Sequence, residues 1–290
     1  IIGYGAFYSN YFWKTQFLPV SYYGILGIIF LTFLSYLSNI FFAHNNIHNS
    51  VIHIIGIVFF FKYLNLRENL KDFKLLFVII FLILSSIYIY KTHDDFPYYH
   101  LPYINNLIES KLIIGNGNFS IAHRTHSSIF YYISIFYIPF ANFKFINISY
   151  FSIILFFNFF FLKKLLEKRK ILNTNFYYFL KLFSFIFINV VFYRLSEYGT
   201  DRVGQIFILL LILFLIRELN DIGNTNINTN FSVLIITFLI TQKTYFISYL
   251  ILFFPLLFHF IRSEKKIFEI ALNRNSIFCL LIITLFFIKS

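Results

Sequence analysis

Two adjacent carboxylates, Asp94 and Asp95, lie in the stretch THDDFPYYHLPY, directly after an apolar run over residues 73–90. A carboxylate at an apolar boundary holds protons and cations more tightly than one in water, which suits a general base or a metal ligand. His100, five residues beyond Asp95, would join the pair if the site binds a divalent metal ion. The structural alternative is a solvated helix end, where an aspartate caps the turn before Pro97.

A second polar stretch, GNGNFSIAHRTHSS, carries Arg124 and His126 near its end. Its glycines alternate with asparagines, a pattern that predicts a tight turn with exposed backbone amides. We expect Arg124 and His126 to bind substrate, and the alternative is a polar loop at the membrane surface. A zinc site built from these histidines and the aspartate pair would match no standard ligand spacing.

Two further segments place charged residues beside apolar runs. Glu197 and Asp201 are four residues apart, so they share one face of a helix, and Arg202 can pair with either. Lys243 follows an apolar run of about twelve residues, which is short for a full membrane crossing. A lysine held below the membrane surface is costly, which makes it a candidate for binding an anion such as a phosphate. The structural alternatives are an ion pair at a helix junction and a lysine whose amine reaches the interface.

The elements that must position these residues are membrane helices. Of the 290 residues, 59% are hydrophobic, 23% are aromatic and 12% are charged, whereas a soluble domain is about 25% charged. This composition excludes a soluble globular protein and a disordered chain, and the single cysteine, Cys279, excludes a disulfide-stapled domain. The net charge of +12 is therefore interpreted as a signal of membrane orientation, not of nucleic-acid binding.

Long apolar runs are predicted to be helices, since an unpaired backbone amide in lipid costs several kcal/mol. They cover residues 20–42, 51–64, 73–90, 145–162, 175–193, 203–216, 231–242, 244–261 and 276–289. The sequence therefore predicts an all-α fold, a polytopic transmembrane helical bundle. We expect residues 1–13 to end an earlier helix and the Asn/Thr-rich stretch 224–230 to be a polar loop. Because the sequence has no Met and stops within an apolar run, we also expect a fragment that is open at both ends.

Most lysines and arginines fall in one set of loops, which the positive-inside rule assigns to the cytoplasm. The candidate site residues then all lie on the outer side. With this orientation the run 127–140 cannot cross the membrane, because a crossing would turn the lysine cluster at 163–170 outward. The run is predicted to be an interfacial or re-entrant helix on the outer side. Residues 92–147 would then form one long outer loop, with two or three short helices near the membrane surface.

The order of these features resembles that of the GT-C superfamily of glycosyltransferases, especially its protein-mannosyltransferase and aminoarabinose-transferase branch. It is also similar to an uncharacterised group of bacterial polytopic proteins with the same layout. Members of the superfamily carry an acidic pair in the first outer loop, as at Asp94 and Asp95. A His-Pro-Pro-Leu motif follows, and its place is taken here by residues 126–129, His-Ser-Ser-Ile, without the prolines.

Two later motifs extend the resemblance over about residues 72–262. An Arg-Pro-Asp-like segment of the superfamily is similar to Gly-Thr-Asp at residues 199–201. A Leu-Thr-Lys-Gly-Pro-like turn is similar to Thr-Gln-Lys-Thr at residues 241–244. The resemblance implies additional N-terminal transmembrane helices over residues 1–71 and a GT-C-like core over residues 72–290 that is truncated at its C-terminus.

The function implied by the resemblance is inverting transfer of a sugar from a polyprenyl-phosphate donor to a glycan, lipid or protein acceptor. The enzyme would lie in a bacterial inner membrane, with its active face periplasmic. Asp94 or Asp95 would accept the proton of the acceptor, and Lys243 with Arg124 or Arg202 would hold the leaving phosphate. The alternatives are a transporter or flippase of lipid-linked glycans, and an integral membrane protein without catalysis.

Overall fold

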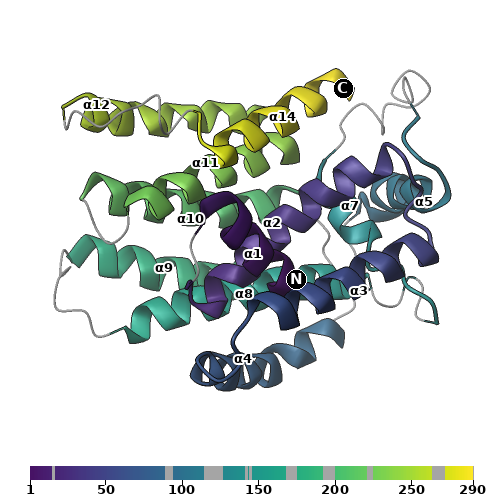
Figure 1. Ribbon diagram of the computed structural model, residues 1–290, viewed down its shortest axis with the longest axis horizontal. Helices are drawn as coiled ribbons and strands as arrows, with labels where there is room; N and C mark the ends of the chain where they lie inside the picture. The colour runs from purple at the N-terminus through teal and green to yellow at the C-terminus, as the bar shows by residue number, and fades with distance from the viewer. Residues whose placement is uncertain are drawn as a thin grey trace.

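The chain folds into a bundle of helices that run largely side by side (Figure 1). The computed structural model describes residues 1–14, 17–88, 94–113, 127–140, 143, 146–167, 175–191, 200–220, 225–262 and 272–289. All regular secondary structure within these ranges is helical, which confirms the predicted all-α class.

The long helices are α2 (Val20–Asn39), α3 (Asn46–Tyr63), α4 (Leu70–Ile83), α8 (Asn147–Leu166), α9 (Asn175–Val191), α10 (Thr200–Leu219), α11 (Thr225–Gln242) and α14 (Arg274–Lys289). The shorter ones are α1 (Ile2–Tyr8), η1 (Ser9–Trp13), η2 (Leu84–Tyr88), η3 (Phe96–His100), α5 (Leu101–Glu109), α7 (Ile129–Ser134), η6 (Thr244–Phe253) and α12 (Phe254–Arg262). Of these, η1 and η3 are π-helical, whereas η2 and η6 are 3-10 helices. Each predicted apolar run corresponds to a helix or to a pair of consecutive helices.

The start of α11 differs from the prediction of a polar loop over residues 224–230. The helix begins at Thr225, because its polar residues find partners on the first turn of α14 and just before it. The side-chain amide of Asn273 donates to Oδ1 of Asn230 at 3.0 Å, and that of Asn275 donates to the Asn230 carbonyl at 3.2 Å. Asparagines that would favour a loop in isolation are thus satisfied inside a helix pair.

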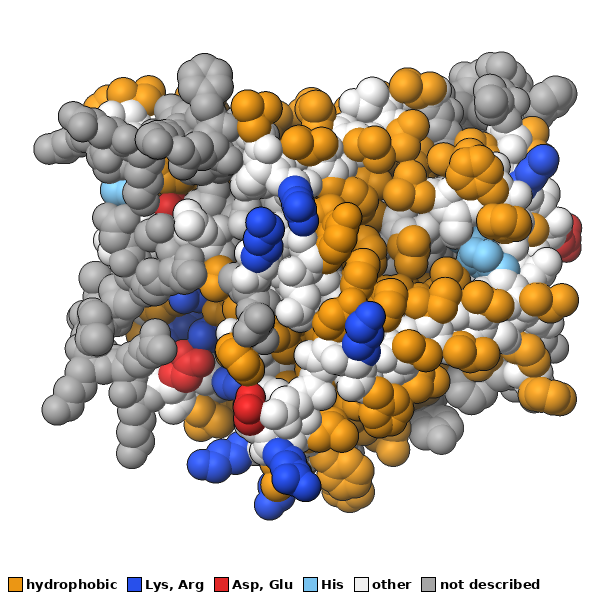
Figure 2. Space-filling view, in the orientation of Figure 1, with side chains coloured by type: hydrophobic (Ala, Val, Ile, Leu, Met, Phe, Trp, Pro, Cys, Tyr) orange, Lys and Arg blue, Asp and Glu red, His pale blue; other side chains and the backbone are white. Residues whose placement is uncertain are grey.

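Among the described residues, three helical segments are long and apolar enough to cross a membrane: Val20–Asn39, Asn147–Leu166 and Thr244–Ile261. The first two are enclosed by other helices, whereas the third is largely exposed. Large apolar side chains are also exposed along α3, α4 and α9, and Figure 2 shows apolar side chains spread across one face of the molecule. Apolar surface on this scale is typical of a membrane protein.

Opposite ends of the bundle carry different residues. At one end Lys163, in the last turn of α8, forms an ion pair with Asp72, in the first turn of α4. Arg217, in the last turn of α10, donates from Nη1 to the hydroxyl of Tyr22, near the start of α2, at 2.6 Å. The ends of four helices meet here, and we call this end of the bundle the basic end.

Helix α7 lies at the other end, where it packs against α2, α5 and α8. All six of its residues are buried, so it lies inside the bundle, as expected of a re-entrant helix and not of an interfacial one. The side-chain amide of Asn49 donates to the carbonyls of Ser134 at 2.9 Å and Tyr137 at 2.7 Å. These bonds satisfy carbonyls that the end of a helix leaves unpaired, which allows the chain to end a helix among apolar neighbours.

Glycines let α1 approach its neighbours closely. A Cβ atom on Gly5 would meet the backbone carbonyl of Tyr23 in α2, and one on Gly3 would meet the carbonyl of Gly56 in α3. Small residues at helix contacts are a usual device of membrane proteins, because close backbone packing replaces the hydrophobic effect in lipid.

Replacing Asp72 with Ala is expected to lower the free energy of unfolding by about 2–3 kcal/mol. The carboxylate accepts from Lys163 and also from the backbone N–H of Val20 at 3.1 Å, so both groups lose a partner. Thermal unfolding in detergent measures this loss. Glu68→Ala is the matched control, because the carboxylate of Glu68 is exposed and accepts from the equally exposed side chain of Asn65. Its loss is expected to lower the free energy of unfolding by less than about 0.5 kcal/mol. Equal unfolding temperatures for the two variants would contradict the assignment.

Candidate functional site

Two segments that the sequence singled out separately meet in the structure. Lys243 follows α11, and its Nζ lies 2.5 Å from Oδ1 of Asp201, in the first turn of α10. The hydroxyl of Tyr245 donates to the same oxygen at 3.4 Å. The side chains of Lys243 and Asp201 are 31% and 49% exposed, so a dissolved or lipid-borne ligand can reach both.

Tyr99 of η3 connects the acidic turn to this ion pair. Burial of the phenol, followed by the charges of Asp95 and Asp201, raises the pKa of Tyr99 above its ordinary value. A hydrogen bond between the side chains of Tyr99 and Thr200 opposes this shift. The hydrogen bond between Tyr99 and Thr200 puts η3, and with it the turn at Asp95 that precedes it, beside the start of α10.

A buried set of hydrogen bonds fixes the chain next to Lys243. The backbone N–H of Ser128 donates to the Thr241 carbonyl at 2.9 Å, and Nε2 of Gln242 donates to Oγ of Ser128 at 2.6 Å. Oγ of Ser127 donates in turn to Oε1 of Gln242 at 3.2 Å. Ser127 and Ser128, the second and third residues of the predicted motif at 126–129, are thus held beside the Lys243 turn.

The other predicted site residues fall into two groups. Arg124, His126 and Glu197 lie outside the described residues. Arg202 lies in the first turn of α10 and is half-buried.

His100, the third predicted metal ligand, is buried beside aromatic rings. Its ring centroid lies 4.2 Å from that of Tyr99 and 5.2 Å from that of Phe130. Within the part of the chain that the structure describes, no three His, Cys, Asp or Glu side chains lie together as a metal site would need. The described arrangement is an ion pair of Lys243 with Asp201, with the hydroxyl of Tyr245 on the same carboxylate.

Sequence reasoning did not find several members of this cluster. It predicted an anion such as phosphate as the partner of Lys243, and in the structure a carboxylate takes that place. It also did not assign Tyr99 or Tyr245 a role beside Asp201. The polar pair Thr241 and Gln242 at the end of an apolar helix was the signal that this turn is held by hydrogen bonds.

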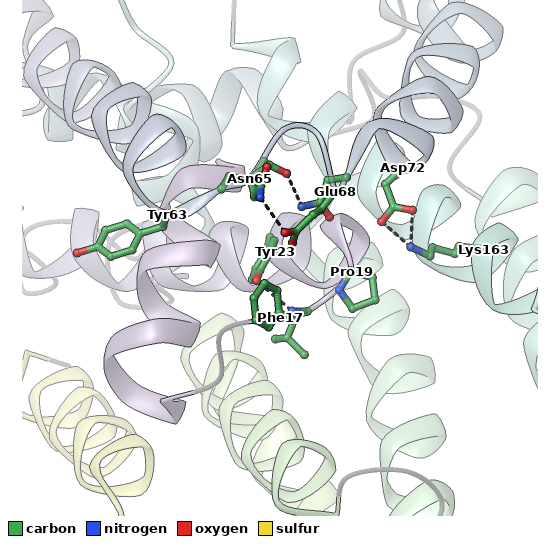
Figure 3. Close-up of a pocket in the computed structure, with 11 residues that line it drawn as sticks. Phe17, Pro19, Tyr23, Tyr63, Asn65, Glu68, Asp72 and Lys163 are labelled. Atoms are coloured by element: carbon green, nitrogen blue, oxygen red, sulfur yellow. Dashed lines mark hydrogen bonds and ion pairs between the residues drawn. The ribbon is translucent and has the colours of Figure 1, made fainter.

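A cavity of about 390 Å³ lies at the basic end, between α4, the end of α8 and the segment before α2 (Figure 3). Its polar lining includes the Asp72–Lys163 ion pair together with Glu68, and its apolar wall includes Tyr23 and Tyr63. None of the site residues predicted from the sequence lines this cavity. The candidate site and the cavity are thus at opposite ends of the bundle.

Comparison with known proteins gives a family. A family model described as a domain of unknown function (DUF8201) matches residues 1–290, so the chain belongs to that family. No curated protein and no solved structure matches the chain. The family description names no activity, so the function has to be argued from the site.

Replacing Gln242 or its neighbour Lys243 is expected to affect stability very differently. Gln242→Leu should lower the free energy of unfolding by about 2 kcal/mol, because the buried hydroxyl of Ser127 loses its acceptor and that of Ser128 keeps only its bond with Thr241 among these contacts. Lys243→Gln should cost less than about 1 kcal/mol, because its ion pair with Asp201 is partly exposed. Chemical unfolding in detergent separates the two, and a larger loss for Lys243→Gln would show that the ion pair is chiefly structural.

Proposed function

We propose that this member of the DUF8201 family is a membrane glycosyltransferase that moves a sugar from a polyprenyl-phosphate donor to an acceptor. The observation that carries the proposal is the meeting of the acidic turn, the start of α10 and Lys243 at one end of the bundle. Sugar transfer from a lipid phosphate needs a base for the acceptor and a cation for the leaving phosphate, and both are present there.

The carboxylates supply the base. Asp94 and Asp95 form an exposed turn ahead of η3, where an acceptor hydroxyl can approach them from solvent. One of them takes the proton as the acceptor oxygen bonds to the anomeric carbon of the sugar. The bond from that carbon to the phosphate oxygen breaks at the same time, so the configuration inverts and the lipid phosphate leaves with the electron pair.

Lys243 supplies the cation. Growing negative charge on the leaving phosphate is stabilised by an amine that is already held in position, and Asp201 holds it. Helix η6 begins immediately after Lys243, and its side chains Ile247 and Ile251 are exposed apolar groups. A polyprenyl tail can therefore lie against η6 while its phosphate is at Lys243.

A transporter or flippase of lipid-linked glycans is the second candidate. It needs polar groups free to bind substrate partway along the helices. The best such residues in the sequence, Asn158 in α8 and Asn189 in α9, bind each other, with Nδ2 of Asn189 donating to Oδ1 of Asn158 at 2.6 Å. This pair joins two helices, which favours an enzyme with its site at one end of the bundle over a path through its middle.

Replacing both aspartates, as Asp94→Asn with Asp95→Asn, is expected to reduce transfer by about a hundredfold or more. The assay follows labelled sugar from a polyprenyl-phosphate donor into the acceptor fraction in membranes that contain the protein. Glu109→Gln is the matched control, because Glu109 is an exposed acid at the end of the neighbouring helix α5. Labelling that is unchanged in the double variant would overturn the proposal.

In the proposed orientation, the protein lies in a bacterial inner membrane. The end of the bundle with Lys243 and the acidic turn faces the periplasm, and the basic end faces the cytoplasm. The single cysteine, Cys279, is buried, so Cys279→Ala provides a background for labelling. In that background Tyr98→Cys, at a position 80% exposed beside the acidic turn, should react with an impermeant maleimide added to intact cells. Lys71→Cys, at the basic end, should react only after permeabilisation. Reaction of both positions from the same side would contradict this orientation.

A further inference from the structure

Three cationic side chains meet at the basic end, on the side of α8 that faces α9 and α10. They are Lys164 near the end of α8, Lys181 in the first half of α9 and Arg217 in the last turn of α10, and we call them the cation cluster. Lys164 and Arg217 are 9% and 8% exposed. Figure 2 shows lysine and arginine side chains gathered at the lower left of the molecule, beside few acidic ones.

Arg217 is buried, and one nitrogen of its guanidinium lacks a hydrogen-bond partner among the described residues. Its Nη1 donates to the Tyr22 hydroxyl at 2.6 Å, whereas its Nε has no hydrogen-bond partner among the described residues. A guanidinium carries five N–H donors in a flat fork, and burying them without acceptors is costly. The described part of the chain therefore leaves the Nε–H of Arg217 without an acceptor.

Among the described residues, the three cations of the cluster share one carboxylate. Glu167 is the carboxylate among the described residues whose charge acts on both Lys181 and Arg217. Both of its oxygens, however, already accept from Nζ of Lys164 at 2.9 Å. One carboxylate thus serves three cations, which repel one another at short range.

Lys181 is the most solvent-exposed residue of the cation cluster. Its Nζ donates to the backbone carbonyl of Lys164 at 3.1 Å and lies 4.9 Å from the ring centre of Tyr177. Lys164 lies in a similar way over the ring of Tyr22, at 5.2 Å. Aromatic rings and a helix-end carbonyl hold the amines in place without neutralising them.

We propose that the cation cluster binds a phosphate group, either the headgroup of an anionic lipid in the adjacent leaflet or a soluble phosphate. Phosphate fits because its oxygens accept from a guanidinium fork and from lysine amines at once. Its charge offsets the excess of cations around Glu167. The site is distinct from Lys243, because Arg217 and Lys243 lie at opposite ends of the bundle. The phosphate proposal is therefore independent of the glycosyltransferase proposal.

Binding of two probes to the purified full chain in neutral detergent tests this site. The probes are a short-chain phosphatidylglycerol and inorganic phosphate, each titrated against the wild-type protein and its variants. Lys181→Gln is expected to raise the dissociation constant about tenfold, because a charge-assisted hydrogen bond is lost. Lys71→Gln removes the same charge from an exposed position at the same end and should change it less than about twofold.

The outcomes separate the sources of the phosphate and the reasons for failure. Binding of the lipid alone identifies a headgroup site, and binding of both probes or of inorganic phosphate alone identifies a site for soluble phosphate. An equal effect of Lys181→Gln and Lys71→Gln would mean general surface charge and would overturn the proposal. The proposal would also be overturned if neither the lipid nor inorganic phosphate bound. Lys181 is only partly buried, so Lys181→Gln is expected to fold, and Arg217→Gln serves as a second variant once its helix content matches the wild type.

Discussion

The cost of placing charge inside an apolar bundle governs the whole arrangement. A charged side chain midway along a membrane helix costs several kcal/mol, so the long helices here carry their charges near their ends. Because successive helices run in opposite directions, these charges collect into two groups. One group surrounds Lys243 and the acidic turn, and the other surrounds Asp72, Lys163 and Arg217. Any polar chemistry must therefore happen at one end or the other.

The two ends differ in how their polar groups are held. At the basic end, ion pairs join helix ends directly, as between Asp72 and Lys163. At the other end, hydrogen bonds between uncharged groups hold more of the chain. Gln242 bonds to Ser127 and Ser128 beside the Lys243 turn, and Asn49 bonds to a carbonyl at the end of α7. Neutral hydrogen bonds can be buried completely without the desolvation cost of an ion pair, which leaves the few charges of that end exposed.

The sequence predicted the helices well because apolar length alone determines them. Runs such as 145–162 and 276–289 correspond to α8 and α14 within a few residues. In the run 127–140, for which no membrane crossing was predicted, the described helix α7 has six residues. What the sequence could not predict depends on contacts between distant segments: the burial of α7 and the helical start of α11 both require partners far away in the chain.

The candidate site was predictable only as separate pieces. Residue type and proximity to an apolar run singled out Asp95, Asp201 and Lys243, but nothing in their spacing says that Asp201 pairs with Lys243. Nor does it say that Tyr99 forms a hydrogen bond with Thr200 at the start of α10. Such pairings follow from which helix ends adjoin, and this is decided by packing across the bundle and not by local sequence.

The 3-10 geometry of η6 gives the segment that follows Lys243 an unusual reach. A 3-10 helix rises about 2.0 Å per residue, against about 1.5 Å for an α-helix. Thr244–Ile261 begins with this stretched winding and continues as α12, so its 18 residues extend over about 32 Å, compared with about 27 Å for an unbroken α-helix. The longer span matches the roughly 30 Å hydrocarbon layer of a bilayer with little tilt of the helix. A slender helix also leaves more room beside it for acyl chains.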